Sequence, residues 1–201
     1  MKYSLLRGIG AFALGLGLSV FSLTAGATVY TSGLSGAIEA PPNASPGTGT
    51  VLVDFDIDQH TLFIDVTFSG LLAGTTAAHI HCCTAVPETG TAGVATQTPV
   101  FVDFPLGVTA GTYQHLFDTT DPASWNASFI TANGGTTAGA EAALLAGLDA
   151  GTAYFNLHTQ LFPSGEIRGF LQPVPEPATV VMLLAGAPLM LVLARRRKGL
   201  A

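Results

Sequence analysis

Hydrophobic and polar residues alternate with a period of two along most of the middle of the chain. The clearest case runs from 51 to 58, where every second residue is hydrophobic and three aspartates lie between, and it resumes from 62 to 68 after Gln59-His60. Successive side chains of a strand point to opposite faces, so this pattern predicts a hairpin. Further strands are predicted at 29–38, 77–81, 100–104 and 112–117, with two more in 153–171.

Two segments between the predicted strands favour short helices. Residues 121–131 begin with Asp-Pro, a capping residue followed by one suited to the first helical turn, and residues 137–148 are rich in alanine and leucine. Short strands that are separated by turn residues are typical of antiparallel sandwiches. The pattern therefore predicts an all-β fold, an antiparallel β-sandwich with one or two short helices.

The segment 153–171 predicts a hairpin with one hydrophobic face and one polar face, joined by a turn at Phe162-Pro163-Ser164-Gly165. The positions expected in the core are Phe155, Leu157, Ile167 and Leu171. The positions expected on the polar face are Tyr154, Asn156, His158, Glu166 and Arg168. We expect each strand of this hairpin to be half-buried.

The N-terminal end has the organisation of a secretory signal peptide. Lys2 and Arg7 form a basic region, residues 9–23 are apolar, and Ala25-Gly26-Ala27 is a small-residue cleavage site. Residues 1–27 are therefore predicted to direct export, with Thr28 as the first residue of the mature chain.

The C-terminal end combines a short proline motif, an apolar segment and a basic tail. Pro175-Glu176-Pro177 comes first, residues 178–194 carry no charge, and Arg195, Arg196 and Arg197 follow with Lys198. The apolar segment is long enough to predict a transmembrane helix. Basic residues stay on the cytoplasmic side, so the preceding domain is expected in the periplasm.

These ordered parts resemble the PEP-CTERM sorting signal of Gram-negative bacteria, which would occupy residues 174–201. The resemblance implies an exosortase as the processing partner. It also implies an inner-membrane anchor before processing, and then a destination at the cell surface or in the exopolysaccharide matrix.

The remaining residues, 28–173, are predicted to form one domain with an acidic charge balance. Arg168 is its single Lys or Arg against twelve acidic residues, a formal charge of −11. This balance argues against nucleic acid and anionic lipid as partners. Among so many acids, Arg168 is interpreted as a structural ion-pair partner.

Three histidines are candidate metal ligands. His79 and His81 lie two positions apart on one predicted strand, so both imidazoles point to the same face. His158, on the polar face of another strand, is the third candidate, and three imidazoles suit copper or zinc. The alternative is that His79 and His81 only form hydrogen bonds with Asn156, Glu166 or backbone carbonyls. The other two, His60 and His115, are interpreted as solvated.

Cys82 and Cys83 directly follow His81. In an exported protein such a pair is typically oxidised. Three interpretations remain open: a disulfide between the two neighbours, a soft metal site shared with His79 or His81, or free thiols.

The segments Ala78-His79-Ile80-His81, Tyr154-x-Asn156-x-His158-Thr159 and Gly165-Glu166-Ile167-Arg168-Gly169 resemble the CHRD domain, named for chordin. The resemblance implies a sandwich of immunoglobulin-like or superoxide-dismutase-like Greek-key type, and it implies Tyr154, Asn156, Glu166, Arg168 and Gly169 as structural motif residues. The bridging histidine and the zinc loop of the dismutases have no match.

The sequence contains no nucleophile elbow, zinc-protease motif or phosphate-binding loop. A non-catalytic module that binds polysaccharide or a surface protein, or that is purely structural, is the leading hypothesis. A copper- or zinc-binding protein is the alternative.

Overall fold

The computed structural model describes residues 27–175, which form one eight-stranded antiparallel sheet with four short helices. The strands are β1 (Thr28–Ser35), β2 (Thr48–Asp56), β3 (Thr61–Ser69), β4 (Thr75–His81), β5 (Gly111–Asp118), β6 (Tyr154–Thr159), β7 (Ile167–Phe170) and β8 (Gln172–Pro173). The helices are the 3₁₀ turns η1 (Gly36–Ile38) and η2 (Pro122–Ser124) and the α-helices α1 (Ala127–Ala132) and α2 (Thr137–Asp149).

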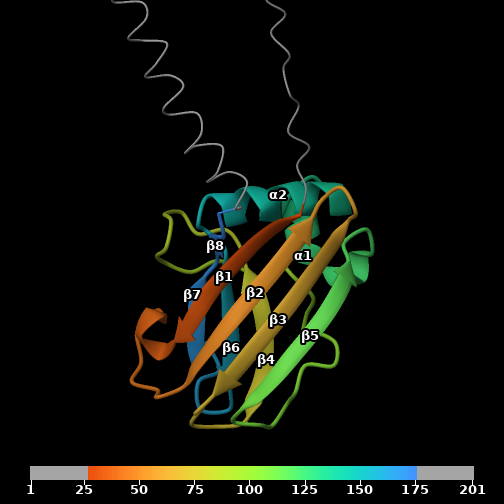
Figure 1. The fold of residues 1–201 in the computed structure, drawn as a ribbon. Helices are drawn as coiled ribbons and strands as arrows, with labels where there is room; N and C mark the ends of the chain where they lie inside the picture. The colour runs from red at the N-terminus through yellow and green to blue at the C-terminus, as the bar shows by residue number, and fades with distance from the viewer. Residues whose placement is uncertain (1–26, 176–201) are drawn as a thin grey trace, which may run out of the picture.

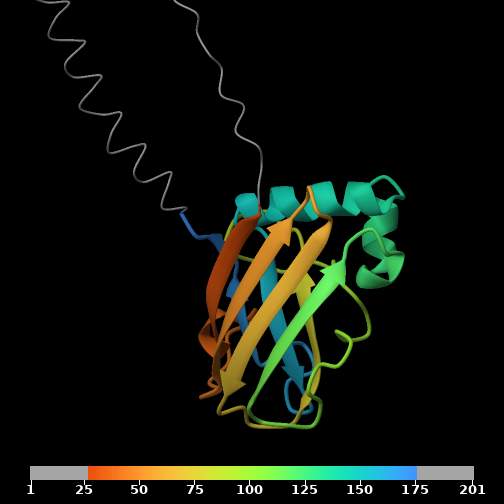
Figure 2. The same cartoon turned by 45° about the vertical axis from the view of Figure 1, so that its right-hand side comes forward.

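The strands follow the order β4-β6-β7-β1-β2-β3-β5, and the sheet curls so that its two halves face each other (Figure 1). The layer of β1, β2, β3 and β5 lies opposite the layer of β4, β6 and β7. The antiparallel β prediction is confirmed, but one continuous sheet forms both layers of the expected sandwich. The layers meet at β1, which pairs with β7 only at Ser35 and Arg168. Helix α2 lies across one end (Figure 2).

The hydrophobic core fills the space between the two layers. It receives every second residue of the long strands, together with Ala140, Leu144 and Leu148 from α2. The side between the two end strands, β4 and β5, is filled by Phe101, whose ring contacts Phe117 of β5 and Phe155 of β6. Residues 100–104, predicted as a strand, instead form a loop that places Phe101 and Phe104 in the core.

Most of the predicted elements are confirmed, including the 48–69 hairpin, the strands around 77–81 and 112–117, and the two helical segments. The first strand ends at Ser35 rather than at residue 38, because the next three residues form η1. No helix of the described part of the chain is long and apolar enough to span a membrane. The predicted signal peptide lies outside the described residues apart from Ala27, and the predicted sorting signal with its transmembrane segment lies outside them apart from Val174 and Pro175.

The 153–171 hairpin has the predicted alternation, but its polar face is not exposed. Phe155, Leu157, Ile167 and Leu171 are all fully buried in the core. On the other face Tyr154, Asn156 and Arg168 are each at most 3 % exposed, and Glu166 is fully buried. The expectation of half-buried strands is therefore wrong for this hairpin. Residues 36–47 and the loop after β4 cover the polar face. The backbone and side chains of these loops are the hydrogen-bond partners of the polar side chains on that face.

Glu166 is the centre of the first group of these hydrogen bonds. Its carboxylate accepts from the Ser45 hydroxyl at 2.6 Å, from the Leu72 backbone N–H at 2.7 Å and from the Thr159 hydroxyl at 2.6 Å. A buried carboxylate is tolerated only when donors replace its lost water, and these three donors come from three separate segments. Glu166 therefore fixes the loops at that end of the sheet to β6.

Arg168 is the centre of the second group. Its guanidinium donates to the Ile38 carbonyl at 2.6 Å and to the Gly90 carbonyl at 2.9 Å, and it lies 3.7 Å from the Glu39 carboxylate. Burial raises the pKa of Glu39 to about 7, against the opposing effect of Arg168. The ion-pair partner expected for Arg168 is thus present, while its two hydrogen bonds to carbonyls connect η1 and the loop after β4 to β7.

The packing of β7 against β1 explains why residue 169 is a glycine. A Cβ at this position would collide with the Gly33 carbonyl oxygen and the Ser32 hydroxyl, because β7 approaches β1 closely there. Only glycine fits this contact without displacing β1.

Replacing Leu157 with Ala should lower the free energy of unfolding by about 2 to 5 kcal/mol, because it leaves a cavity in the core. Leu161→Ala in the turn of the same hairpin is the matched control: Leu161 is 58 % exposed, and we expect a change below about 0.5 kcal/mol. Urea unfolding of both variants measures the difference. Equal costs would show that the register of the hairpin is wrong.

Glu166→Gln should be strongly destabilising although it preserves shape. The amide that replaces the carboxylate carries two N–H donors, but the groups around it are themselves donors and offer no acceptor. Each unsatisfied buried group costs about 1 to 3 kcal/mol. Glu88→Gln, at an exposed position, is the control and should be silent in the same thermal unfolding measurement. A Glu166→Gln protein as stable as the wild type would contradict the role of this carboxylate.

Candidate metal centre

His79 and His81 of β4 lie beside His158 of β6 on the outer face of the sheet. In the register of these antiparallel strands Ala77 pairs with His158 and His79 pairs with Asn156, so His158 is a diagonal neighbour of His79. The ring centroids are 5.3 Å apart for His79 and His158, 5.8 Å for His79 and His81, and 5.9 Å for His81 and His158. The structure therefore brings the three candidate ligands together.

Each of the three rings binds a backbone carbonyl through one nitrogen. His79 Nε2 lies 2.7 Å from the Pro99 oxygen, His81 Nδ1 lies 2.9 Å from the Ala92 oxygen, and His158 Nδ1 lies 3.0 Å from the Pro163 oxygen. A carbonyl can only accept, so each of these nitrogens carries the proton. In the neutral rings the lone pairs consequently belong to His79 Nδ1, His81 Nε2 and His158 Nε2.

Each ring brings one nitrogen close to a nitrogen of the other two rings. The candidate ligand atoms of the cluster lie within 4.8 Å of one another, and His79 Nδ1 is 3.4 Å from His158 Nε2. His79 Nδ1 and His158 Nε2 both lack a proton, so they cannot form a hydrogen bond with each other. His81 Nε2 is buried without any hydrogen-bond partner. In a tetrahedral site with bonds of about 2.0 to 2.1 Å, ligand nitrogens are about 3.3 Å apart. The pair at 3.4 Å already has this spacing.

Burial keeps the imidazoles in the form that binds metals. It lowers the pKa of His79 and of His81 to about 4, and it lowers the pKa of His158 as well. For His79 and His81 hydrogen bonding to the backbone carbonyl works in the opposite direction but is the smaller effect. Both rings are therefore neutral at pH 7, and a cation does not need to displace a proton from them.

Tyr154 and Arg168 hold the His81 side of the cluster in place. The Tyr154 ring stacks on His81 with centroids 4.8 Å apart, and the Arg168 guanidinium lies 4.9 Å from the centre of the Tyr154 ring. The Tyr154 hydroxyl accepts from the Ala92 N–H at 3.2 Å. The Tyr154 side chain thus positions Ala92, whose carbonyl accepts the hydrogen bond from His81. Outer-shell groups position the ligands of metal sites in the same way.

Asn156 and Glu166, the alternative partners considered for the histidines, do not bind them. Asn156 donates to the Ser164 carbonyl at 3.4 Å, and Glu166 is occupied by its own donors. The backbone-carbonyl part of that alternative is present, since all three rings use a carbonyl. It accounts for one nitrogen of each ring and leaves the converging nitrogens unexplained.

Cys82 and Cys83 form a disulfide, so their sulfur atoms are neither free thiols nor thiolate ligands in this structure. Both sulfurs pack against α2 at Gly147, where any Cβ would collide with them. The disulfide therefore connects the end of β4 to the helix by packing, and the candidate centre consists of histidine nitrogens alone.

The carbonyls of Ala92, Pro99 and Pro163 are the functional groups that sequence analysis missed. They belong to the backbone of loops, and no residue type signals a carbonyl that accepts from a ligand. The loop after β4 could only be placed over the histidines once the register of β4 and β6 was known.

In the metal-free protein, stability should fall on the acid side of neutrality. The folded pKa of about 4 for His79 and His81 lies below the ordinary value of 6.5, so the unfolded chain binds more protons between these values. The contribution of His79 and His81 to the free energy of unfolding is complete above pH 6.5 and is lost as the pH falls toward 4. Urea unfolding in the presence of a chelator measures it, and His79→Gln should show a shallower dependence. Identical pH profiles for the variant and the wild type would contradict the buried, neutral state of His79.

Comparison with known proteins gives one family match. The family model described as CHRD domain matches residues 30–171, which includes every strand except β8 and the first two residues of β1. No curated protein and no solved structure matches the chain.

Proposed function

The chain belongs to the CHRD domain family, and from this premise we propose that it is a non-enzymatic binding or structural module that holds one copper or zinc ion. The ligands are His79 Nδ1, His81 Nε2 and His158 Nε2. The observation that carries the proposal is that the three rings bring one nitrogen each within 4.8 Å of the others, while each ring binds a backbone carbonyl through one of its nitrogens.

Copper and zinc are the ions that this donor set suits. Neutral imidazole is a ligand for both, whereas calcium and magnesium require oxygen donors. Three protein ligands leave a fourth position for water or for a donor from a partner. The formal charge of −11 between residues 28 and 173 favours any cation at long range.

Dismutase activity is not part of the proposal. Such an enzyme needs a bridging histidine and a zinc-binding loop, and the sequence matches neither. The two other histidines are separate from the centre: His60 binds Glu141, and His115 lies on β5 beside Phe117. The ion would accordingly stabilise the loops around β4 and β6, or offer its fourth position to a partner.

The cellular setting is a second part of the proposal and rests on the sequence. Residues 1–27 direct export, residues 174–201 act as a PEP-CTERM signal that an exosortase processes, and the domain reaches the cell surface or the exopolysaccharide matrix. Polysaccharide or a surface protein is the proposed partner there. The two ends of the domain are compatible with this arrangement, because the Val174 N–H binds the Val29 carbonyl at 2.8 Å and both tails therefore start at the α2 end.

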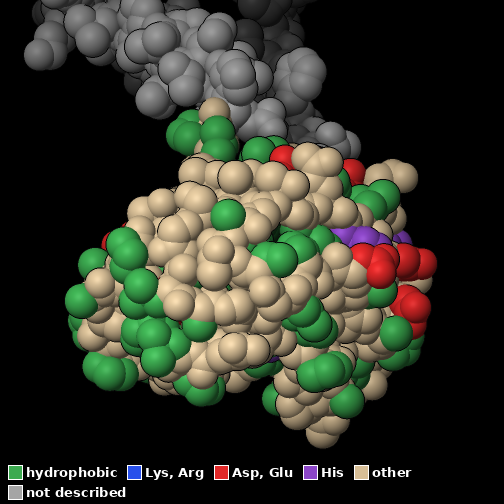
Figure 3. Space-filling model, turned by 90° about the horizontal axis from the view of Figure 1, so that it is seen from below, with side chains coloured by type: hydrophobic (Ala, Val, Ile, Leu, Met, Phe, Trp, Pro, Cys, Tyr) green, Lys and Arg blue, Asp and Glu red, His purple; other side chains and the backbone are tan. Residues whose placement is uncertain are grey.

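The opposite end is the surface that such tethering leaves free. Seen from that end, acidic side chains gather at one side next to a histidine, and hydrophobic side chains are scattered among uncharged polar groups over the rest (Figure 3). This surface is mixed and largely uncharged, and the β3–β4, β4–β5 and β6–β7 loops carry the exposed leucines Leu72, Leu106 and Leu161. Its composition agrees with a neutral partner and not with a nucleic acid.

Metal analysis of the full chain, purified without chelators, tests the metal proposal. We expect about one equivalent of copper or zinc that withstands gel filtration, because three neutral, preoriented imidazoles bind these ions tightly. His79→Gln and, at the more exposed position, His158→Gln should each lose most of it. His115→Gln is the matched control and should retain the metal.

Two results would contradict the metal proposal. One is a wild-type protein that takes up neither ion even when it is loaded with Cu²⁺ or Zn²⁺ and then desalted. The other is metal content that is unchanged in both His79→Gln and His158→Gln. Circular dichroism of each variant distinguishes loss of a ligand from loss of the fold.

A further inference from the structure

His60, interpreted from the sequence as a solvated turn residue, is held by a buried carboxylate. It lies at the tip of the β2–β3 turn in a left-handed conformation with φ of 55°. Its Nδ1 is 2.9 Å and 3.1 Å from the two carboxylate oxygens of Glu141 on α2. The His60 side chain is 49 % exposed, whereas Glu141 is only 3 % exposed. The Nδ1 edge of the ring is therefore anchored to a buried group, while about half of the side chain reaches solvent.

The Glu141 carboxylate fixes the orientation and the tautomer of His60. Glu141 also accepts a hydrogen bond from the Thr119 hydroxyl, so its position is set by two elements besides its own helix. A carboxylate only accepts, and His60 Nδ1 must carry the proton. The lone pair of the neutral ring then lies on Nε2. Histidines that bind metal ions are oriented in this manner, by a carboxylate on the nitrogen that does not bind the metal.

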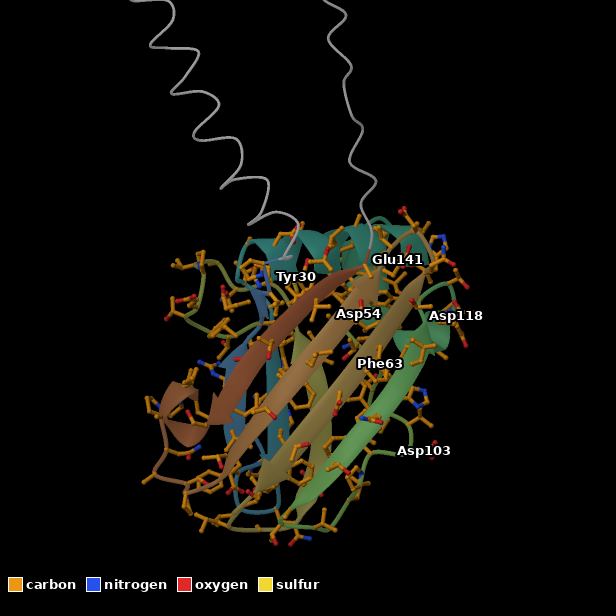
Figure 4. All side chains as sticks on the ribbon, in the orientation of Figure 1. Tyr30, Asp54, Phe63, Asp103, Asp118 and Glu141 are labelled. Carbon is orange, nitrogen blue, oxygen red and sulfur yellow. A yellow bond between two sulfur atoms is a disulfide. The ribbon has the colours of Figure 1, made fainter. Side chains whose placement is uncertain are left out.

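A cavity of about 370 Å³ adjoins His60. Its lining consists of Gln59, His60, Thr61, Leu116, Phe117, Asp118 and Thr120. Asp118 and Glu141 lie at the same end of the molecule, where β5 ends beneath α2 (Figure 4). Asp118 pairs with Thr61 across the strands, and its Oδ1 accepts from the Thr120 N–H at 2.8 Å and from the Thr120 hydroxyl at 2.6 Å. The cavity thus combines an oriented imidazole with a fixed, exposed carboxylate.

We propose that this cavity is a second metal site, which binds a divalent transition-metal ion such as Zn²⁺ through His60 Nε2 and the Asp118 carboxylate. One nitrogen and one anionic oxygen suit Zn²⁺, and water completes the coordination in a site this open. The Glu141 carboxylate holds the imidazole through Nδ1 and leaves Nε2 for the metal, which is the role of outer-shell carboxylates in metal sites. With two protein ligands on the surface, the ion is bound more weakly than at the three-histidine centre and exchanges with solvent.

The site is independent of the three-histidine centre. It uses different strands, and its histidine is oriented by a carboxylate rather than by carbonyls. A purely structural role for the His60–Glu141 pair would tie α2 to the β2–β3 turn without any affinity for metal. The two roles differ in one measurable respect, namely whether Zn²⁺ binding depends on His60.

Isothermal titration of the full chain with Zn²⁺ tests this proposal. The wild-type protein should show a weak, chelator-labile class of one equivalent in addition to any tight class. His60→Gln should abolish the weak class, Asp118→Asn should weaken it, and Glu141→Gln should weaken it by about 10- to 100-fold, the usual effect of losing an orienting partner. His115→Gln, which changes a histidine outside the cavity lining, is the matched control and should leave both classes unchanged.

The outcomes separate the two metal proposals. If no tight class exists, the three-histidine proposal fails, while a weak class that depends on His60 still supports the second site. The second site is contradicted if His60→Gln leaves all Zn²⁺ binding unchanged, or if His115→Gln reduces the weak class as much. His60 is half exposed, so its variant should fold, and circular dichroism verifies this.

Discussion

The outer face of the β6–β7 hairpin can be buried only because Glu166 and Arg168 find partners for their charges there. Glu166 gathers donors from three segments, and Arg168 gathers carbonyls from two loops and lies near Glu39. A buried charge without such partners costs several kcal/mol. The loops supply partners for the buried charges of the hairpin, and the polar side chains of the hairpin in turn bind the loops to the sheet.

The candidate metal centre depends on the same attachment. The carbonyls that orient His79 and His81 belong to Pro99 and Ala92 in the loop after β4, and Arg168 binds that loop at Gly90. The carbonyl that orients His158 belongs to Pro163, in the turn that leads directly to Glu166. Three imidazoles on a sheet surface would otherwise rotate freely in water. Covered by these loops, they are neutral and each presents one lone pair toward the others.

Sequence reasoning predicted the elements whose signal is local. The alternation in 51–68 and in 153–171 predicted both hairpins, and the His79–His81 spacing placed two rings on one face. It failed where long-range packing decides. Phe101 lies in a loop whose position is set by packing of its ring into the core between β4 and β5. The polar face of the hairpin is buried because distant loops supply hydrogen-bond partners for it. The His60–Glu141 pair, 81 residues apart, has no local signal at all.

Anomalous diffraction from crystals of the protein loaded with copper or zinc, recorded on both sides of the absorption edge of that metal, tests the central claim most directly. The account predicts a peak bonded to His79 Nδ1, His81 Nε2 and His158 Nε2 at about 2.0 to 2.1 Å, with the Ala92, Pro99 and Pro163 carbonyls still bound to the opposite nitrogens. Absence of a peak between these rings in metal-loaded crystals, or bonds through the carbonyl-bound nitrogens, would contradict it.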